Sequence, residues 1–294
     1  GEFDWIAFEK ASRLFLVAQE ILVDYASYPT KDIAIKSHRF RPLGLGYANL
    51  GGMLMRMAIP YDSAPAGEWT AAVTSTMHFA ALQASVELAE LKGPFEGFYD
   101  DRLNMFQVLH LHQAALDKLQ LTPKLQIQIE RVRLDSVNTL ERAGRSGLRN
   151  AQVTLIAPTG TIGLFMDCDT LGIEPDFALV KIKNMVGGKS FRLVNRSVPM
   201  ALQRLGYSGS QIADVEKFLL EKGALTDAPH LSEAHHLVFH TAVPPSGQPE
   251  RIISWKGHLR IMAAAQPFLS GGISKTVNLP QTATVETVRE VYLS

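Results

Sequence analysis

The apolar positions in the first half of the chain recur at helical spacing. From Asp4 to Tyr25 they lie three or four residues apart, which places them on one face of a helix, and Asp4 stands where an N-cap is expected. The same pattern predicts helices over residues 68–91, 100–121 and 125–143. The first half of the chain is therefore predicted to be mainly helical.

Short apolar runs bounded by turn residues mark the second half. Residues 153–157 are an apolar run that ends at Pro158, and residues 179–185 alternate Val or Ile with Lys. Residues 270–280 are interpreted as a polar turn that leads into a strand. Glycines between positions 44 and 52 indicate a further strand that turns closely into a helix. Strands separated by helices predict an α/β fold with parallel strands, whose carboxyl ends carry the functional residues.

The turn after residues 153–157 is the strongest candidate site. It consists of Pro158, Thr159, Gly160, Thr161 and Ile162. Glycine lets the backbone approach a ligand, and successive N–H groups with hydroxyl donors can converge on phosphate oxygens. An ordinary strand-ending turn uses the same residue types, so both interpretations stay open at this point. The turn is not the phosphate loop of nucleoside triphosphatases, because no Lys follows its second glycine.

Composition and charge narrow the class of protein. The 294 residues carry 29 Lys and Arg against 29 Asp and Glu, so no overall field attracts the chain to nucleic acid or to a membrane surface. No apolar run approaches the roughly 18–20 residues of a membrane span, and no secretion signal begins the chain. The single cysteine, Cys168, fits a reducing compartment and is interpreted as a small buried apolar residue. We expect a cytoplasmic protein.

Two groups of residues raise the question of a metal site. Asp167, Asp169 and Glu174 follow the candidate turn, but their spacing matches no metal loop, and helix caps or turn acceptors explain them better. Four histidines between His230 and His240 suggest a zinc hydrolase as an alternative, although the His-Glu-x-x-His order is absent. The prediction is that the chain holds no metal.

Several stretches together resemble the catalytic chain of the adenosylcobalamin-dependent, class II ribonucleotide reductases, in one order along nearly the whole chain. They are residues 43–52, residues 148–163, residues 168–177 and residues 257–280, which include the motifs Leu-Gly-Leu-Gly-Tyr-Ala-Asn, Ala-Pro-Thr-Gly-Thr-Ile-Gly, Gly-Ile-Glu-Pro-Asp-Phe and Ile-Ser-Lys-Thr-Val-Asn-Leu-Pro. The resemblance implies that residues 1–294, without an internal boundary, are the C-terminal part of the family's barrel domain. The implied fold is the second half of a ten-stranded α/β barrel, with parallel half-barrel strands and surrounding helices.

The resemblance also implies a function. In that family the Pro-Thr-Gly-Thr-Ile element binds the phosphates of a ribonucleoside di- or triphosphate, and this role falls on Pro158, Thr159, Gly160, Thr161 and Ile162. The family reduces the ribose by radical chemistry that adenosylcobalamin initiates and that a radical cysteine and a cysteine pair carry out. Which residues contact the cofactor is not assigned, and a homodimer is compatible with the resemblance.

The chain departs from a complete enzyme of this family. The reaction needs three cysteines, and this chain has only Cys168, which matches none of the reaction cysteines. Residues 239–242 stand where many relatives have an Asp-Cys pair. The family's Asn-x-Cys-x-Glu motif should precede Gly1, so the expected partner is the missing N-terminal part of the same chain, and we expect the fragment to be inactive alone. The alternative is a nucleotide-binding module without catalysis.

Overall fold

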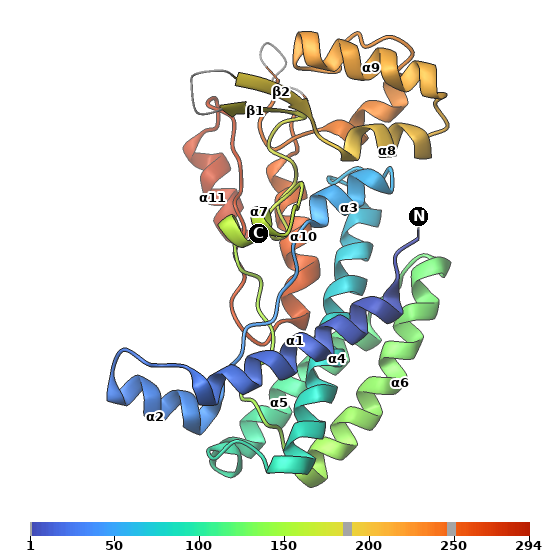
Figure 1. Cartoon of the computed structure of the whole chain (residues 1–294). Coiled ribbons are helices and arrows are strands. Elements are labelled where there is room, and N and C mark those ends of the chain that lie inside the picture. The colour runs from blue at the N-terminus through green and yellow to red at the C-terminus, as the bar shows by residue number, and fades with distance from the viewer. Residues whose placement is uncertain (1, 185–189, 246–250) are drawn as a thin grey trace. The chain divides into compact units, whose positions relative to one another are not determined.

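The computed structural model describes residues 2–184, 190–245 and 251–294, and the side chains of residues 182–191 are left undescribed (Figure 1). These residues form two compact units. Unit 1 comprises residues 1–46, 68–157 and 264–273, and unit 2 comprises residues 47–67, 158–263 and 274–294. Each unit is described by itself.

Unit 1 is built mainly from helices. They are α1 (Trp5–Tyr25), α2 (Lys31–Phe40), most of α4 (Ala64–Lys92), α5 (Phe98–Asp117), α6 (Pro123–Ser146) and the short 3-10 helix η2 (Gln266–Phe268). The helices predicted from the apolar spacing are confirmed, and the Asp4 carboxylate accepts the Ala7 amide at 2.9 Å as the N-cap of α1. The sequence interpretation missed α2, a helix of 10 residues in which no residue is buried.

Three extended segments lie side by side in unit 1. Parallel bridges join Leu45 to Thr154 and Ile156 to Ile273. The glycines before Tyr47 allow this approach, since a Cβ on Gly46 would lie 2.6 Å from the Leu155 carbonyl oxygen. The predicted segments are thus neighbours and parallel.

Within the described residues these three segments are joined only by single bridges and do not form regular strands, which differs from the parallel strands that were expected. One physical reason is that Ser270 Oγ accepts the amides of Val153 and Thr154, both at 3.0 Å, so these N–H groups do not enter a ladder. The one sheet among the described residues is antiparallel and pairs β1 (Val180–Asn184) with β2 (Ser190–Val194). It confirms the strand predicted near residues 179–185, although Met185 lies outside the described residues.

Unit 2 holds the candidate site. Its helices are α3 (Leu50–Arg56), α7 (Gly160–Phe165), α8 (Ser197–Arg204), α9 (Gly209–Lys222), the 3-10 helix η1 (Glu233–Phe239), most of α10 (Trp255–Ala265) and α11 (Val285–Leu293). A buried apolar cluster around Val198, Leu202, Val215 and Leu219 packs α8 against α9 and includes Phe239 of η1. The core therefore fixes the half of unit 2 that follows the β1–β2 hairpin.

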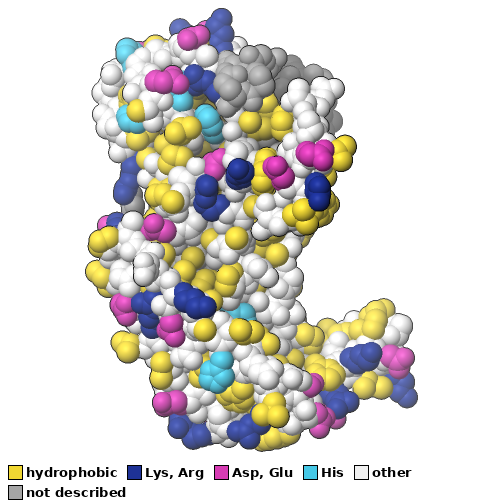
Figure 2. All heavy atoms as spheres, turned by 180° about the vertical axis from the view of Figure 1, so that it is seen from behind, with side chains coloured by type: hydrophobic (Ala, Val, Ile, Leu, Met, Phe, Trp, Pro, Cys, Tyr) yellow, Lys and Arg dark blue, Asp and Glu magenta, His cyan; other side chains and the backbone are white. Residues whose placement is uncertain are grey.

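The described surface carries both signs of charge. Figure 2 shows Lys and Arg side chains interspersed with Asp and Glu side chains over the face that it draws. No helix within the described ranges combines the length and the apolar character of a membrane span.

Candidate functional site

The predicted phosphate turn has an unusual backbone. Thr159 has φ 60° and ψ −37°, and the Gly160 amide donates to the Pro158 carbonyl oxygen at 2.8 Å, which closes a γ-turn around Thr159. A β-branched residue at positive φ is strained, and such strain persists only where the surroundings hold it. The structure therefore maintains an unfavourable conformation at the centre of the predicted site.

The contact that holds this turn comes from the loop that follows α7. Thr159 Oγ1 accepts the Gly172 amide at 3.0 Å. Gly163 leaves room for this side chain, since a Cβ there would lie 2.9 Å from Thr159 Oγ1. The Thr159 hydroxyl is thus engaged as an acceptor, and its proton can still be donated to a ligand.

The donors of Thr161 are unused among the described residues, whereas the Ile162 amide donates to the Thr159 carbonyl oxygen at 3.0 Å. Thr161 is exposed, and neither its amide nor its hydroxyl forms a hydrogen bond within the described part of the chain. The Ile162 side chain is 59% exposed. The turn therefore presents an amide and two hydroxyl protons to solvent, which is a donor set suited to an anion.

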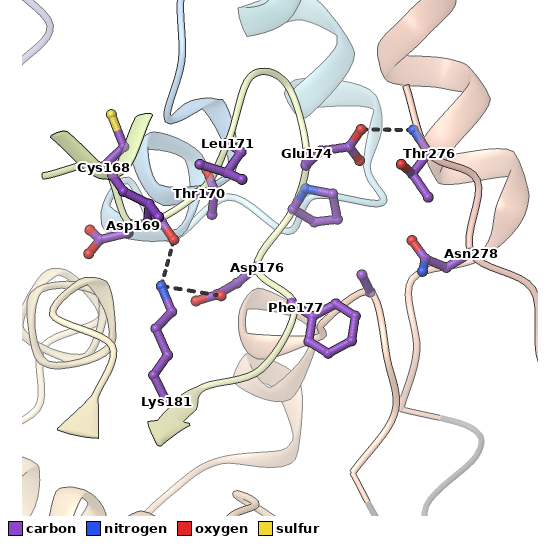
Figure 3. Close-up of a pocket in the computed structure, with 13 residues that line it drawn as sticks. Cys168, Asp169, Thr170, Leu171, Glu174, Asp176, Phe177, Lys181, Thr276 and Asn278 are labelled. Atoms are coloured by element: carbon purple, nitrogen blue, oxygen red, sulfur yellow. Dashed lines mark hydrogen bonds and ion pairs between the residues drawn. The ribbon is translucent and has the colours of Figure 1, made fainter. Parts of the chain in front are cut away.

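A cavity of about 430 Å³ lies beside the same segment of unit 2 (Figure 3). It is lined by Leu164, Cys168, Asp169, Thr170, Leu171, Glu174, Pro175, Asp176, Phe177, Lys181, Ala242, Thr276 and Asn278. None of the five predicted phosphate-binding residues lines it, but Leu164 of α7 does. The cavity instead joins two stretches that the resemblance singled out, residues 168–177 and residues 274–280.

A buried carboxyl group forms part of the cavity wall. Asp176 accepts the Asn195 side-chain amide, and Lys181 Nζ lies 3.9 Å from its Oδ1. Burial raises the pKa of Asp176 from 3.8 to about 6, although the Lys181 charge opposes this shift. Figure 3 shows Lys181 reaching both this carboxyl and the Asp169 carbonyl oxygen, to which its ammonium donates at 2.6 Å. Asp176 can therefore bind or release a proton near neutral pH.

A second buried cluster joins the two walls of the cavity. Lys275 Nζ donates to Glu174 Oε2 at 2.5 Å and to the Thr276 carbonyl oxygen at 2.6 Å, and lies 2.7 Å from His258 Nδ1. Burial lowers the pKa of Lys275, while Glu174 opposes that effect. Burial, with Lys275 nearby, also lowers the pKa of His258 to about 3, so this imidazole is neutral and accepts at Nδ1. The cluster fixes the Gly-Ile-Glu-Pro turn against residues 274–278.

Cys168 is less buried than its interpretation as a small buried apolar residue predicts. It is half-buried and lines the cavity. Burial, followed by the charges of Asp169 and Asp167, raises the pKa of this thiol. A thiol that resists deprotonation is a poor nucleophile.

The three acidic residues after the turn are ion-pair partners. Asp167 pairs with Arg196, Asp169 with Arg56, and Glu174 with Lys275. The expectation of turn acceptors or helix caps was therefore incomplete, because the positive partners come from distant positions in the chain. No group of three or more His, Cys, Asp and Glu side chains gathers as a metal site within the ranges that the structure describes.

The clustered histidines have separate partners. Tyr207 bonds to His235, Asp214 to His230 and Arg251 to His236. His236 lies in η1, a 3-10 helix that ends at Phe239, and His240 follows that helix. The arrangement does not bring these side chains together as one zinc site.

Sequence reasoning missed two residues with structural roles near the site. Asn49 was noted only as part of the motif in residues 43–52, and Lys275 only as part of the stretch of residues 257–280. A lysine within the predicted turn and strand of residues 270–280 was the available signal for Lys275, since a buried lysine needs a partner. Asn49 offered no comparable signal, because its role depends on residues that are over a hundred positions away.

Comparisons with known proteins agree with these stretches. Residues 1–294 match a family model described as the barrel domain of ribonucleotide reductase. A protein from Rhodopirellula baltica named vitamin B12-dependent ribonucleotide reductase is 44% identical to this chain, over 99% of this chain and 28% of the relative. A protein of the same name from Streptantibioticus cattleyicolor is also 44% identical, over 97% of this chain and 47% of the relative. The protein of that name from Streptomyces clavuligerus is 43% identical over 99% of this chain and 30% of the relative. The chain thus spans between about a quarter and a half of these relatives' length, and it belongs to the ribonucleotide reductase family.

Proposed function

We propose that this chain supplies the substrate-phosphate turn of a vitamin B12-dependent ribonucleotide reductase. Pro158, Thr159, Gly160, Thr161 and Ile162 would bind the phosphates of a ribonucleoside di- or triphosphate, which the complete enzyme reduces to the 2′-deoxyribonucleotide. The observation that carries this proposal is the strained turn at Thr159, which leaves the Thr161 amide and hydroxyl free to bind an anion.

The radical and redox cysteines would come from the rest of the catalytic chain. With Cys168 as the single cysteine, residues 1–294 cannot supply both a thiyl radical and a dithiol. This chain would bind and orient the nucleotide, which lowers the reaction barrier by holding the ribose in a reactive geometry. A nucleotide-binding module without catalysis remains the alternative, and the same cysteine count favours it.

Adenosylcobalamin is the cofactor that the relatives' names imply. When bound, it supplies the radical. The cavity of about 430 Å³ in unit 2 has the size of a site for a small ligand and is too small for a corrinoid. We therefore assign no cofactor contact to this chain.

The parallel bridges support the proposed half-barrel. Leu45 with Thr154 and Ile156 with Ile273 are paired in parallel, and the Pro158 turn follows directly on the middle segment. A position after the carboxyl end of a parallel strand is where ligands bind in α/β folds. On this proposal, residues 1–294 belong to one barrel domain.

The test compares phosphate-bearing and phosphate-free ligands. Thr161→Val should weaken binding of adenosine diphosphate on the order of ten-fold, since a hydrogen bond to a charged group is worth roughly 1.5–3 kcal/mol, and it should leave adenosine binding nearly unchanged. Titration calorimetry measures both. Thr161→Ser keeps the hydroxyl and is the matched control.

The same experiment separates the two threonines. Thr159→Val removes the acceptor of the Gly172 amide, so it should destabilise the turn as well as weaken ligand binding. Thr161 forms no internal hydrogen bond within the described residues, so Thr161→Val should affect ligand binding alone. Equal loss of adenosine and adenosine diphosphate binding in Thr161→Val would contradict the phosphate assignment.

A further inference from the structure

We infer that Asn49 is a positioning residue for the phosphate turn. The inference rests on the proposed function, because it concerns how the turn at Thr159 is kept in its binding conformation. Asn49 itself lies outside the turn and makes none of the proposed ligand contacts. It acts through the loop of residues 169–172, which we call the anchor loop.

Asn49 fastens the first half of the anchor loop. Its Oδ1 accepts the amide of Asp169 at 3.0 Å and the amide of Thr170 at 3.0 Å. Two adjacent backbone donors thus converge on one side-chain oxygen. Asn49 has φ 67° and ψ 26°, a left-handed conformation that places it at the N-cap of α3. Asparagine tolerates this conformation better than most residues, and it also provides the acceptor.

The start of α3 fastens the rest of the anchor loop. The Gly52 amide donates to Thr170 Oγ1 at 3.2 Å, and the Leu50 amide donates to the Gly172 carbonyl oxygen at 3.4 Å. Gly52 must lack a side chain, because a Cβ there would lie 2.4 Å from Asn49 Oδ1. The oxygen of Asn49 therefore occupies space that only a glycine leaves open.

The last residue of the anchor loop holds the phosphate turn. The carbonyl of Gly172 is bonded to α3, and its amide donates to Thr159 Oγ1 at 3.0 Å. Thr170 is 3% exposed, so water cannot easily replace these bonds. A continuous set of hydrogen bonds thus runs from Asn49 through the anchor loop to the strained residue of the turn. Loss of the Asn49 oxygen should release the anchor loop, and the positive φ at Thr159 should then relax.

Three substitutions separate the two properties of Asn49. Asn49→Gly keeps the left-handed conformation and removes the acceptor, whereas Asn49→Asp keeps both. Ala58→Gly is the matched control, because Ala58 also has a positive φ, 57°, and follows the other end of α3. Any effect of introducing glycine at a left-handed position is therefore present in the control as well.

The experiment measures binding and local order in the same variants. Titration with adenosine diphosphate and with adenosine should show that Asn49→Gly weakens diphosphate binding about five-fold or more, with adenosine changed less than about two-fold, and that Ala58→Gly changes neither. Amide hydrogen exchange followed by NMR should show faster exchange at Gly172 in Asn49→Gly. Asn49→Asp should keep the protection of Gly172. This readout remains usable if Asn49→Gly is too unstable for titration.

Two outcomes would overturn different claims. If the unmodified chain binds adenosine diphosphate no more tightly than adenosine, the proposed function fails and the positioning role fails with it. If the unmodified chain prefers the diphosphate, but Asn49→Gly keeps both that preference and the slow exchange of Gly172, the positioning role alone is overturned. Faster exchange of Gly172 in Asn49→Asp would also contradict it.

Discussion

Lys275 and Glu174 form a buried ion pair in unit 2, with 2.5 Å between Nζ and Oε2. The Lys275 side chain has no exposed surface, and the Glu174 side chain is 25% exposed. The second carboxylate oxygen of Glu174 accepts the Thr276 amide at 2.8 Å. The Glu174 carboxylate therefore binds both the Lys275 ammonium and the Thr276 amide, and so holds the segment of residues 274–278 that lines the cavity.

Removing one partner of this pair should cost more than removing both. Lys275→Met fills a similar volume but leaves the carboxylate of Glu174 without its cation, so we expect the free energy of unfolding to fall by about 3 kcal/mol. Lys275→Met combined with Glu174→Gln should regain a large part of that loss, since no uncompensated charge remains. Urea unfolding of the single and double variants measures the coupling.

An exposed pair provides the control for this prediction. Lys124 and Glu2 are 2.8 Å apart, with side chains 58% and 79% exposed. Lys124→Met should change the free energy of unfolding by no more than about 0.5 kcal/mol, because exposed ion pairs contribute little. A loss for Lys275→Met as small as this would show that the buried pair does not stabilise unit 2.

Asp176 should make stability depend on pH. Its pKa is raised from 3.8 to about 6 by burial, so the folded state binds the proton more tightly than the unfolded state. This contribution is fully present below pH 3.8 and is lost as the pH rises through about 6. Asn mimics the protonated group, so Asp176→Asn should gain stability relative to the unmodified chain between pH 4 and pH 7, on the order of 2–3 kcal/mol.

Asp167 is the matched carboxylate for this measurement. It is exposed, and its hydrogen bond with Arg196 lowers its pKa, in the direction opposite to that of Asp176. Asp167→Asn should therefore show no gain in stability as the pH rises. Urea unfolding at several pH values compares the two variants. A pH-independent difference between Asp176→Asn and the unmodified chain would mean that the carboxyl is already ionised throughout this range.

The chain by itself should not reduce ribonucleotides. Incubation of residues 1–294 with a ribonucleoside triphosphate or diphosphate, adenosylcobalamin and a dithiol should yield no deoxyribonucleotide, because one cysteine cannot replace three. Chromatography of the products detects any turnover. Adding the upstream part of the catalytic chain, with its cysteines, should restore activity if the chain serves a reductase, and should not do so if it is a binding module. Turnover by residues 1–294 alone would contradict the division of roles proposed here.

The sequence alone was sufficient for the helices and for the family. Apolar spacing predicted α1, α4, α5 and α6. A helix that packs on one side repeats its apolar residues every three or four positions, whereas α4 is buried on nearly every side between residues 70 and 82. The ordered motifs between residues 43 and 280 predicted the ribonucleotide reductase family, which the family model confirms. The predicted phosphate turn remains a prediction, although its residues form a distinct turn.

Only the tertiary structure could decide which residues act together. The strained φ of Thr159 is held by Gly172, which is bonded to α3, and Lys275 is paired with Glu174 from a hundred residues earlier. Such pairings depend on how the chain returns to the same place, and spacing along the sequence carries no record of it. The same reason applies to the strands. Apolar runs predicted where extended segments lie, but the segments meet as single bridges. Ser270 Oγ accepts two of the backbone amides that a ladder would use, and the sequence did not predict this contact.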